Sequence, residues 1–325
     1  MRYIFFLIIS LSYIFANAHI FVYHRFGDDR YPTANTTQKQ LISQFEYFKN
    51  NGYKVVPLKS ILEKLEKNED IPDNWVALTI DDGYKSFYQN GLKIFKQYNY
   101  PFSLYIYVKA TTSHYGDYMS WKEIKEVAKY GSIGLHSYAH PRLQNLSDDE
   151  IIKDTKKAYD IFVQKMGYKP QVYVYPYGEY DPRVQKILKD NFDFRAILNQ
   201  NTGSVTKSTN IYDIPRIALT GRSNIAYKLR YKSFNVKWQE PKEFPKNGIL
   251  KKIIAYVDPK YKNLKLYITG EGWRDIKVKD GLIDETFNIY LKKARTRLLL
   301  GPDTFTVSNH LINKSKYKGE KKYVK

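Results

Sequence analysis

Between residues 19 and 220, apolar runs of strand length alternate with segments of helix length. In one such segment Leu41, Phe45 and Phe48 recur with helical spacing, whereas the run WVALTI (75–80) is almost continuously apolar. A continuous apolar run of this length is typical of a strand buried on both faces of a parallel sheet. The alternation predicts a parallel α/β fold, either a barrel or an open sheet, with functional residues at the carboxyl ends of the strands.

The pattern changes beyond about residue 225, where seven short strand-like runs follow one another without a convincing helix. In the run LKLYITG (264–270), leucine and isoleucine alternate with lysine, tyrosine and threonine, so one strand face should be buried and the other solvated. These runs predict a small β-sandwich over residues 232–313, after a first domain over residues 19–222. Residues 314–325 are rich in lysine and are expected to form a frayed basic tail.

The first 18 residues have the pattern of a secretory signal peptide. Met1 and Arg2 precede an apolar stretch, and Ala16-Asn17-Ala18 offers small residues at a cleavage site. We therefore expect cleavage after Ala18 and an exported protein, periplasmic or secreted, with no stable membrane span after cleavage. An uncleaved membrane anchor is the alternative, although the apolar stretch is short for a bilayer.

Charge and cysteine content limit the possible partners and cofactors. The chain has a formal net charge of +20 and no cysteine, so any metal must be held by His, Asp or Glu. Residues 221–325 contain 25 Lys and Arg against 10 Asp and Glu, whereas the first 220 residues contain 28 against 23. In an exported protein this basic C-terminal part favours an anionic cell-envelope surface or polysaccharide over nucleic acid, unless it is simply a solvated surface.

Two adjacent carboxylates, Asp81 and Asp82, follow the predicted strand WVALTI and precede Gly83. Neighbouring carboxylates repel each other, so they are stabilised together when a cation lies between them or when one keeps its proton. Successive side chains diverge, so one Asp can bind a metal while the other stays free as a base. An ordinary Asp-Gly turn at a strand end is the alternative interpretation.

The segment GLHSYAHP places His136 and His140 four residues apart at another predicted strand end. This spacing brings two imidazoles onto one face of a helical turn, which is a common zinc geometry. The alternative is one structural and one surface histidine. Together with one Asp, the two histidines would give three protein ligands and an open position, as in a catalytic site that accepts zinc, cobalt or nickel.

A third segment, VYPYGEYD, ends a further predicted strand. Tyr177 and Gly178 could point backbone N–H groups toward the same mouth, where an oxyanion would need them. By itself the segment would also pass for an ordinary turn.

The ordered motifs TIDDG, HSYAH and YPYG resemble those of the polysaccharide deacetylases of carbohydrate esterase family 4, and the likeness extends over about residues 19–220. The resemblance implies a distorted (β/α) barrel of about seven strands and metal-dependent removal of acetyl groups from polysaccharides. By position it implies Asp81 as the catalytic base and Tyr177 as an oxyanion-binding backbone N–H. It also implies that Asp82, His136 and His140 are the metal ligands.

Two departures from the family pattern affect the predicted site. Many members have an arginine where this chain has Val174, and Arg216 could supply that charge from another strand, held by Asp213. The late histidine that normally brings the general acid has no match before residue 225. His24 on the first strand is the candidate instead, as in the exported poly-N-acetylglucosamine deacetylases that the chain resembles here, with a buried structural histidine as the alternative.

The sequence therefore predicts an exported, metal-dependent deacetylase that removes N-acetyl groups from a glycan containing N-acetylglucosamine, such as peptidoglycan or poly-N-acetylglucosamine. Two alternatives stay open at this point. One is a catalytically silent glycan-binding protein that keeps the barrel as a scaffold, which the missing arginine and histidine would favour. The other is an O-acetyl esterase on the same scaffold.

Overall fold

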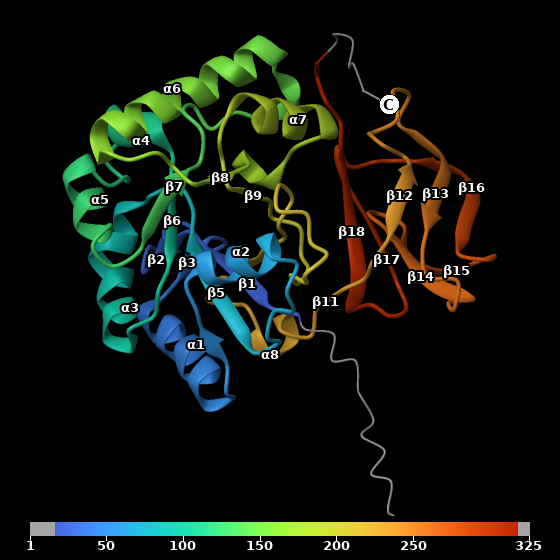
Figure 1. The fold of residues 1–325 in the computed structure, drawn as a ribbon, viewed down its shortest axis with the longest axis horizontal. Coiled ribbons are helices and arrows are strands. Elements are labelled where there is room, and N and C mark those ends of the chain that lie inside the picture. Colours follow the sequence, from blue (N-terminus) through green and yellow to red (C-terminus); the bar gives the residue numbers. More distant parts are fainter. Residues whose placement is uncertain (1–16, 318–325) are drawn as a thin grey trace, which may run out of the picture.

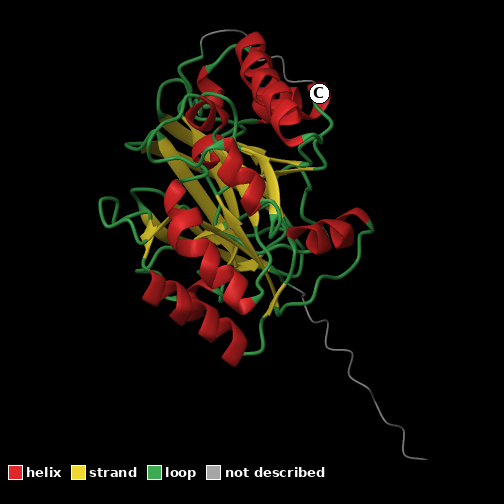
Figure 2. Ribbon diagram, turned by 90° about the vertical axis from the view of Figure 1, so that its left-hand side faces the viewer, coloured by secondary structure: helices red, strands yellow, loops and turns green. Residues whose placement is uncertain are grey.

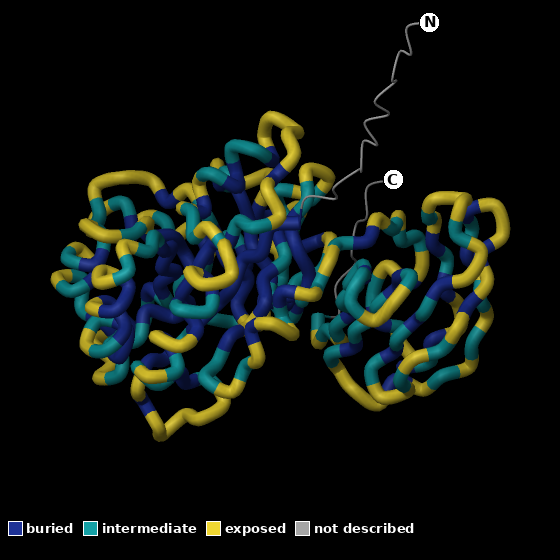
Figure 3. The backbone as a smooth tube through the Cα atoms, turned by 90° about the horizontal axis from the view of Figure 1, so that it is seen from below, coloured by how far each residue is buried: buried dark blue, intermediate teal, exposed yellow. Residues whose placement is uncertain are grey.

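The computed structural model describes residues 17–317, which form two regions that lie side by side (Figure 1). The first is an α/β barrel and the second, over residues 232–313, consists of β-sheets and is called here the β region. Figure 3 shows buried segments inside each region, in keeping with separate apolar clusters in the barrel and in the β region. The predicted signal peptide lies almost entirely outside the described residues.

The barrel sheet has seven parallel strands on one path, which fits the predicted distorted (β/α) barrel. In spatial order they are β10 (Ile217–Ala218), β1 (His19–Tyr23), β5 (Trp75–Ile80), β6 (Ser103–Ile106), β7 (Ser132–Leu135), β8 (Val172–Val174) and β9 (Ala196–Leu198). Two-residue strands lie beside this path: β4 (Lys54–Val55) pairs with the start of β5, and β2 (Arg25–Phe26) pairs with β3 (Asn35–Thr36). β5 is buried from Val76 to Ile80, as the continuous apolar run WVALTI predicts, and β1 is buried at every position.

Helices surround this sheet (Figure 2). They are α1 (Gln38–Asn50), α2 (Leu58–Glu66), α3 (Leu92–Tyr98), α4 (Val108–Thr112), α5 (Trp121–Val127), α6 (Asp148–Met166), α7 (Pro182–Asn191) and α8 (Ile225–Lys228). The longest, α6, begins at Ser147, whose hydroxyl accepts from the Glu150 N–H while the Glu150 carboxylate accepts from the Ser147 N–H. This reciprocal cap satisfies two backbone donors that the first turn would otherwise leave unpaired. No helix within residues 17–317 combines the length and apolar character that crossing a bilayer requires.

The β region contains a five-stranded and a three-stranded sheet. The first has the order β11 (Lys232–Ser233), β18 (Thr306–Asn313), β17 (Arg295–Gly301), β14 (Asn263–Ile268) and β15 (Gly272–Lys277). The second has the order β12 (Lys237–Glu240), β13 (Ile249–Tyr256) and β16 (Leu282–Tyr290). Leu266 and Leu298 of the larger sheet and Ile253 of the smaller one belong to one apolar cluster. Both sheets therefore bury a face in a common core.

The prediction that residues 314–325 fray is wrong for the first of them. The Ser315 hydroxyl donates to the Gln144 carbonyl, and the Lys316 N–H donates to the Asn145 side chain at 2.8 Å. The Arg183 guanidinium lies 4.2 Å from the Tyr317 ring centre. The chain therefore returns from β18 to the barrel surface, because barrel side chains and carbonyls offer it partners that its own composition does not reveal.

The predicted signal cleavage site lies where the described chain joins the barrel. Ala18 is buried and exchanges two backbone hydrogen bonds with Val205, at 3.0 and 2.8 Å. The Asn17 side-chain carbonyl accepts from the Ser204 hydroxyl at 2.7 Å and from the Ser233 N–H at 3.1 Å. Cleavage after Ala18 would remove these hydrogen bonds, so the cleaved protein would lose their contribution to stability.

Candidate active site

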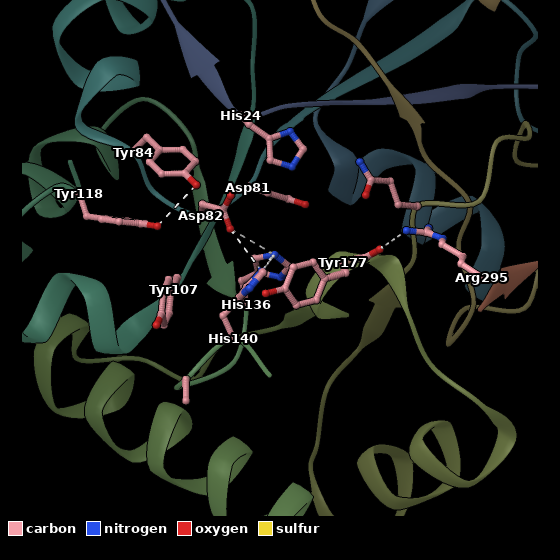
Figure 4. A pocket seen from close by; sticks show the side chains of 12 residues that line it. His24, Asp81, Asp82, Tyr84, Tyr107, Tyr118, His136, His140, Tyr177 and Arg295 are labelled. Atoms are coloured by element: carbon pink, nitrogen blue, oxygen red, sulfur yellow. Dashed lines mark hydrogen bonds and ion pairs between the residues drawn. The ribbon is translucent and has the colours of Figure 1, made fainter. Parts of the chain in front are cut away.

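A pocket with a cavity volume of about 490 Å³ opens where the barrel strands end. His24 follows β1, Asp81 and Asp82 follow β5, Tyr107 follows β6 and His136 follows β7. The pocket is further lined by Tyr84, Tyr118, Ala139, His140, Tyr177, Gln200 and Arg295. Parallel strands bring their carboxyl ends to one edge, which is why residues far apart in sequence converge there (Figure 4).

Asp82, His136 and His140 form a group whose ligand atoms all lie within 4.8 Å of one another. Asp82 Oδ1 is 3.5 Å from the Nε2 atom of each histidine, and the two Nε2 atoms are 3.0 Å apart. One carboxylate and two imidazoles are the donor set of many catalytic zinc sites.

The hydrogen bonds around the histidines suit a metal. His136 Nδ1 lies 3.0 Å from the Val174 carbonyl, which can only accept, so Nδ1 carries the proton and Nε2 presents its lone pair to the group. Burial, with the neighbouring His136, lowers the pKa of His140 to about 4, so its imidazole is neutral at pH 7. Neutral imidazoles are the form that binds metals, and the residues present therefore fit a divalent ion.

The turn that brings the histidines together is not the helical turn expected from their spacing. Residues 137–140 form a bend in which Ser137 and His140 have left-handed backbones, with φ of 66° and 53°. The Ser137 hydroxyl accepts from the His140 N–H at 2.8 Å. The Asp154 carboxylate on α6 accepts from the N–H groups of Tyr138 and Ala139, at 3.0 and 2.9 Å. Tertiary contacts therefore replace the helical hydrogen bonds that the i, i+4 pattern assumes.

Backbone strain gathers at this pocket. Asp82 and Tyr177 also have left-handed backbones, with φ of 71° and 61°. For residues with a Cβ this conformation costs on the order of 1 kcal/mol each, and it persists where surrounding contacts enforce it. Such strain is typical of functional sites, since it aims side chains where relaxed turns would not.

Asp81 lies beside the Asp82 group but is held by a different partner. The buried Arg216 guanidinium donates to both Asp81 oxygens, at 2.8 and 2.7 Å, and to the Thr79 hydroxyl at 3.0 Å. Burial alone would raise the pKa of Asp81, but the charge and hydrogen bonds of Arg216 outweigh burial and lower that pKa to about 2. The carboxylate therefore stays ionised and fixed in orientation. The structure thus places Arg216, from just before β10, where the sequence analysis expected an orienting charge.

The predicted support for Arg216 is different. Asp213 forms no hydrogen bond or ion pair with Arg216; instead, Asp213 accepts from the Tyr180 hydroxyl and from the Asn199 side-chain amide. Arg216 Nε donates to the Asn199 carbonyl at 2.8 Å. Asp213 therefore supports Arg216 only indirectly, through Asn199. The guanidinium itself donates to Asn199, Thr79 and Asp81.

His24 and Tyr177 lie on opposite sides of the pocket. The His24 imidazole points toward Asp81 from the end of β1 (Figure 4). The Tyr177 ring packs edge-on against His140, with ring centres 4.5 Å apart, and the Arg142 guanidinium lies 4.3 Å from the Tyr177 ring centre. The structure thus brings both residues to the pocket that holds Asp81, while their roles in the chemistry stay predictions.

Sequence reasoning missed the pocket residue that comes from the β region. Arg295, at the start of β17, donates from Nη1 to the Tyr177 carbonyl at 3.0 Å and lies 3.8 Å from a Glu179 oxygen. Tyr84, Tyr107 and Tyr118 were missed as well, since 31 tyrosines give no signal as to which ones line a pocket. The basic segment KKARTR, in which β17 begins, does not indicate that Arg295 contacts Tyr177, which is 118 residues away in sequence.

Known proteins resemble the barrel in sequence and in fold. The sequence model of the polysaccharide deacetylase family matches residues 68–193. A poly-beta-1,6-N-acetyl-D-glucosamine N-deacetylase of Staphylococcus aureus is 27% identical over 214 residues, which cover 62% of this chain and 73% of that protein. A protein of the same name from Escherichia coli is 22% identical over 242 residues, covering 61% of this chain and 35% of that protein.

Two solved structures share the barrel fold. The Streptococcus pyogenes deacetylase PplD, in complex with acetate, superposes with a TM-score of 0.60 at 20% identity, covering 66% of this chain and 98% of that one. IcaB from Ammonifex degensii gives 0.55 at 21% identity, covering 63% and 92%. The family match spans Asp81, Asp82, His136 and His140, but not His24. The barrel region that holds this site is therefore similar in sequence to the polysaccharide deacetylase family and in fold to solved deacetylases.

Proposed function

We propose that this chain is a metal-dependent deacetylase that removes N-acetyl groups from a glycan containing N-acetylglucosamine, either poly-N-acetylglucosamine or peptidoglycan. One observation carries the proposal: an ionised Asp81, fixed by Arg216, lies in the same pocket as the Asp82–His136–His140 group. The relatives named poly-beta-1,6-N-acetyl-D-glucosamine N-deacetylase make the β-1,6-linked polymer the first substrate to test.

Asp82, His136 and His140 would hold one divalent ion, for which zinc is the first choice and cobalt or nickel would also serve. When bound, such an ion supplies Lewis acidity at the acetyl carbonyl. The remaining chemistry is assigned to the side chains and backbone of this chain.

In the proposed reaction, water attacks the acetyl carbon, the C–N bond breaks, and acetate and a free sugar amine leave. Asp81 accepts the proton of the attacking water, with Arg216 as the positioning residue that keeps the carboxylate ionised and oriented. The Tyr177 backbone N–H donates to the oxyanion that develops on the acetyl oxygen. His24, in its protonated form, donates a proton to the departing amine from the other side of the pocket.

Acetate release from both polymers, with and without a chelator, tests the proposal. We expect release that depends on the metal and that falls about 10²–10⁴-fold in Asp81→Asn, because that variant loses the base. The metal content of Asp81→Asn should be unchanged, since Asp81 is not one of the three proposed ligands. Release from O-acetylated glycan alone would identify an esterase instead. Binding of glycan with metal present and no release would identify a silent binding protein.

We further propose that the chain is exported by its N-terminal signal, and that residues 19–222 and 232–313 are the catalytic barrel and an accessory β-sandwich. The excess of lysine and arginine after residue 220 would then attract an anionic cell-envelope polymer. Such binding should weaken as salt rises from about 0.01 to 1 M, over which the Debye length falls from about 30 to 3 Å. Affinity that does not change with salt would refute this role of the basic region.

A further inference from the structure

A second groove, with a volume of about 270 Å³, lies where the β region meets the barrel. Its floor is a row of residues that face one another across four neighbouring strands of the five-stranded sheet: Trp273 on β15, Tyr267 on β14, Leu299 on β17 and Asn309 on β18. Alternate positions of β14 and β17, such as Leu266 and Leu298, are buried in the core, so this row lies on the outer face of the sheet.

Aromatic rings dominate this groove and remain accessible. Trp273 is 38% exposed and packs against Tyr267, with ring centres 5.3 Å apart. Tyr227 is 47% exposed and forms one wall of the groove together with Tyr231. Thr202 also lines the groove. Exposed aromatic faces that form a concave surface favour a ligand with a flat apolar face, which the C–H groups of a sugar ring provide.

Two polar side chains of the groove have atoms without a hydrogen-bond partner in the described chain, and a ligand could supply those partners. Arg297 Nε and Asn309 Oδ1 are buried without a hydrogen-bond partner among the described residues. Burial lowers the pKa of Arg297, although the neighbouring Tyr267 and Tyr231 oppose that effect, so its guanidinium is costly to leave unpaired. Among the described residues that line the groove, Arg297 is the one charged side chain. Such a lining suits hydroxyl and acetamide oxygens and disfavours a cationic amine.

The groove continues from the catalytic pocket along two chain segments. On β17, Arg295 lines the catalytic pocket and Arg297 lines the groove. After β9, Gln200 lines the pocket and Thr202 lines the groove. Arg295 and Arg297 are two residues apart on one strand, so they point to the same face about 7 Å apart. Gln200 and Thr202 are also two residues apart, in the irregular segment after β9. A polymer with one sugar in the pocket can therefore extend into the groove.

We propose that the groove formed by Trp273, Tyr267, Tyr227 and Arg297 is a sugar-binding subsite that holds an acetylated unit of the same glycan chain whose acetyl group is removed in the pocket. The aromatic rings stack on the sugar, Arg297 donates to its hydroxyl or acetamide oxygens, and Asn309 Oδ1 accepts from a sugar hydroxyl or from the acetamide N–H. This inference rests on the proposed function, because it takes that reaction's polymer as the ligand. It gives the β region a role in selecting long, still acetylated chains.

The test measures binding of β-1,6-linked N-acetylglucosamine chains to full-length Asp81→Asn by titration calorimetry, with a disaccharide and a long oligomer as probes. Adding Trp273→Ala or Arg297→Gln should weaken binding of the long oligomer about tenfold and leave disaccharide binding unchanged. The matched control is Tyr256→Ala, which removes a 48% exposed aromatic ring of the β region that does not line the groove and should change neither affinity. A fully deacetylated oligomer should bind more weakly than the acetylated one.

Unchanged affinity of the long oligomer in both groove variants would overturn the subsite, as would equal losses for the disaccharide and the oligomer. Neither result would affect the proposed function, which depends on acetate release by the unmodified protein. If the unmodified protein released no acetate, the deacetylase would be refuted, whereas a length-dependent loss in Trp273→Ala would still establish the groove as a glycan site.

Discussion

The barrel and the β region expose functional groups in different ways. Barrel strands such as β1 and β5 are buried at almost every position, so they carry polar groups where they end. In β14, by contrast, fully buried positions alternate with more exposed ones, so one face remains available along the whole strand. The comparison teaches that this chain builds a catalytic mouth from strand ends and a binding surface from a strand face. Arg295 connects the two.

The largest effect is expected at the barrel mouth, from His136→Ala. Removing one of three proposed ligands should abolish both metal binding and acetate release. His114→Ala, which removes an exposed histidine outside the pocket, should change neither. Metal content measured by mass spectrometry checks the prediction, and full metal occupancy in His136→Ala would show that the ligands lie elsewhere.

The next effect tests how much stability depends on the buried charges of the mouth. Arg216→Gln should lower the free energy of unfolding by about 3–5 kcal/mol, because it leaves the Asp81 carboxylate buried without its ion-pair partner. The double variant Asp81→Asn/Arg216→Gln should regain much of that stability but no activity. Chemical denaturation provides the measurement. Equal stability of the single and double variants would mean that the pair does not couple.

A smaller effect is expected from the support of the histidine turn. Asp154→Asn should weaken metal binding about 10–100-fold, since the weaker acceptor loosens the N–H groups that hold residues 138 and 139 in place. Asp160→Asn on the exposed side of the same helix is the matched control and should leave the affinity unchanged. Competition with a chelator of known affinity measures the metal affinity of both variants. An unchanged metal affinity in Asp154→Asn would show that the histidine turn keeps its conformation without the Asp154 carboxylate.

The smallest effect is expected where the two regions meet. Arg295→Ala should reduce kcat/KM about tenfold, with the metal content unchanged, because the Tyr177 turn loses a hydrogen bond from the β region. Lys293→Ala, two residues earlier and exposed, should have no effect. A wild-type kcat/KM in Arg295→Ala would show that the barrel mouth works without the β region.

Much of the barrel site could be predicted because each motif directly follows a strand. The apolar run before Asp81 fixed where its strand ends, and the family resemblance ordered the motifs around one mouth. The helical turn at His136 and His140 was wrong, because Asp154 and Ser137 supply hydrogen bonds that local spacing cannot reveal. Arg295 was missed for a related reason: its contact with Tyr177 joins two regions across 118 residues.

The sequence by itself determined the alternation of strands and helices, the switch to an all-β pattern, and the residue types available for catalysis, because these depend on periodicity and local chemistry. Only the tertiary structure decided which acceptors surround Arg216, how the histidine turn bends, and that β17 reaches the catalytic pocket. Those features depend on contacts between segments distant in sequence, which form only when the core brings their backbones together.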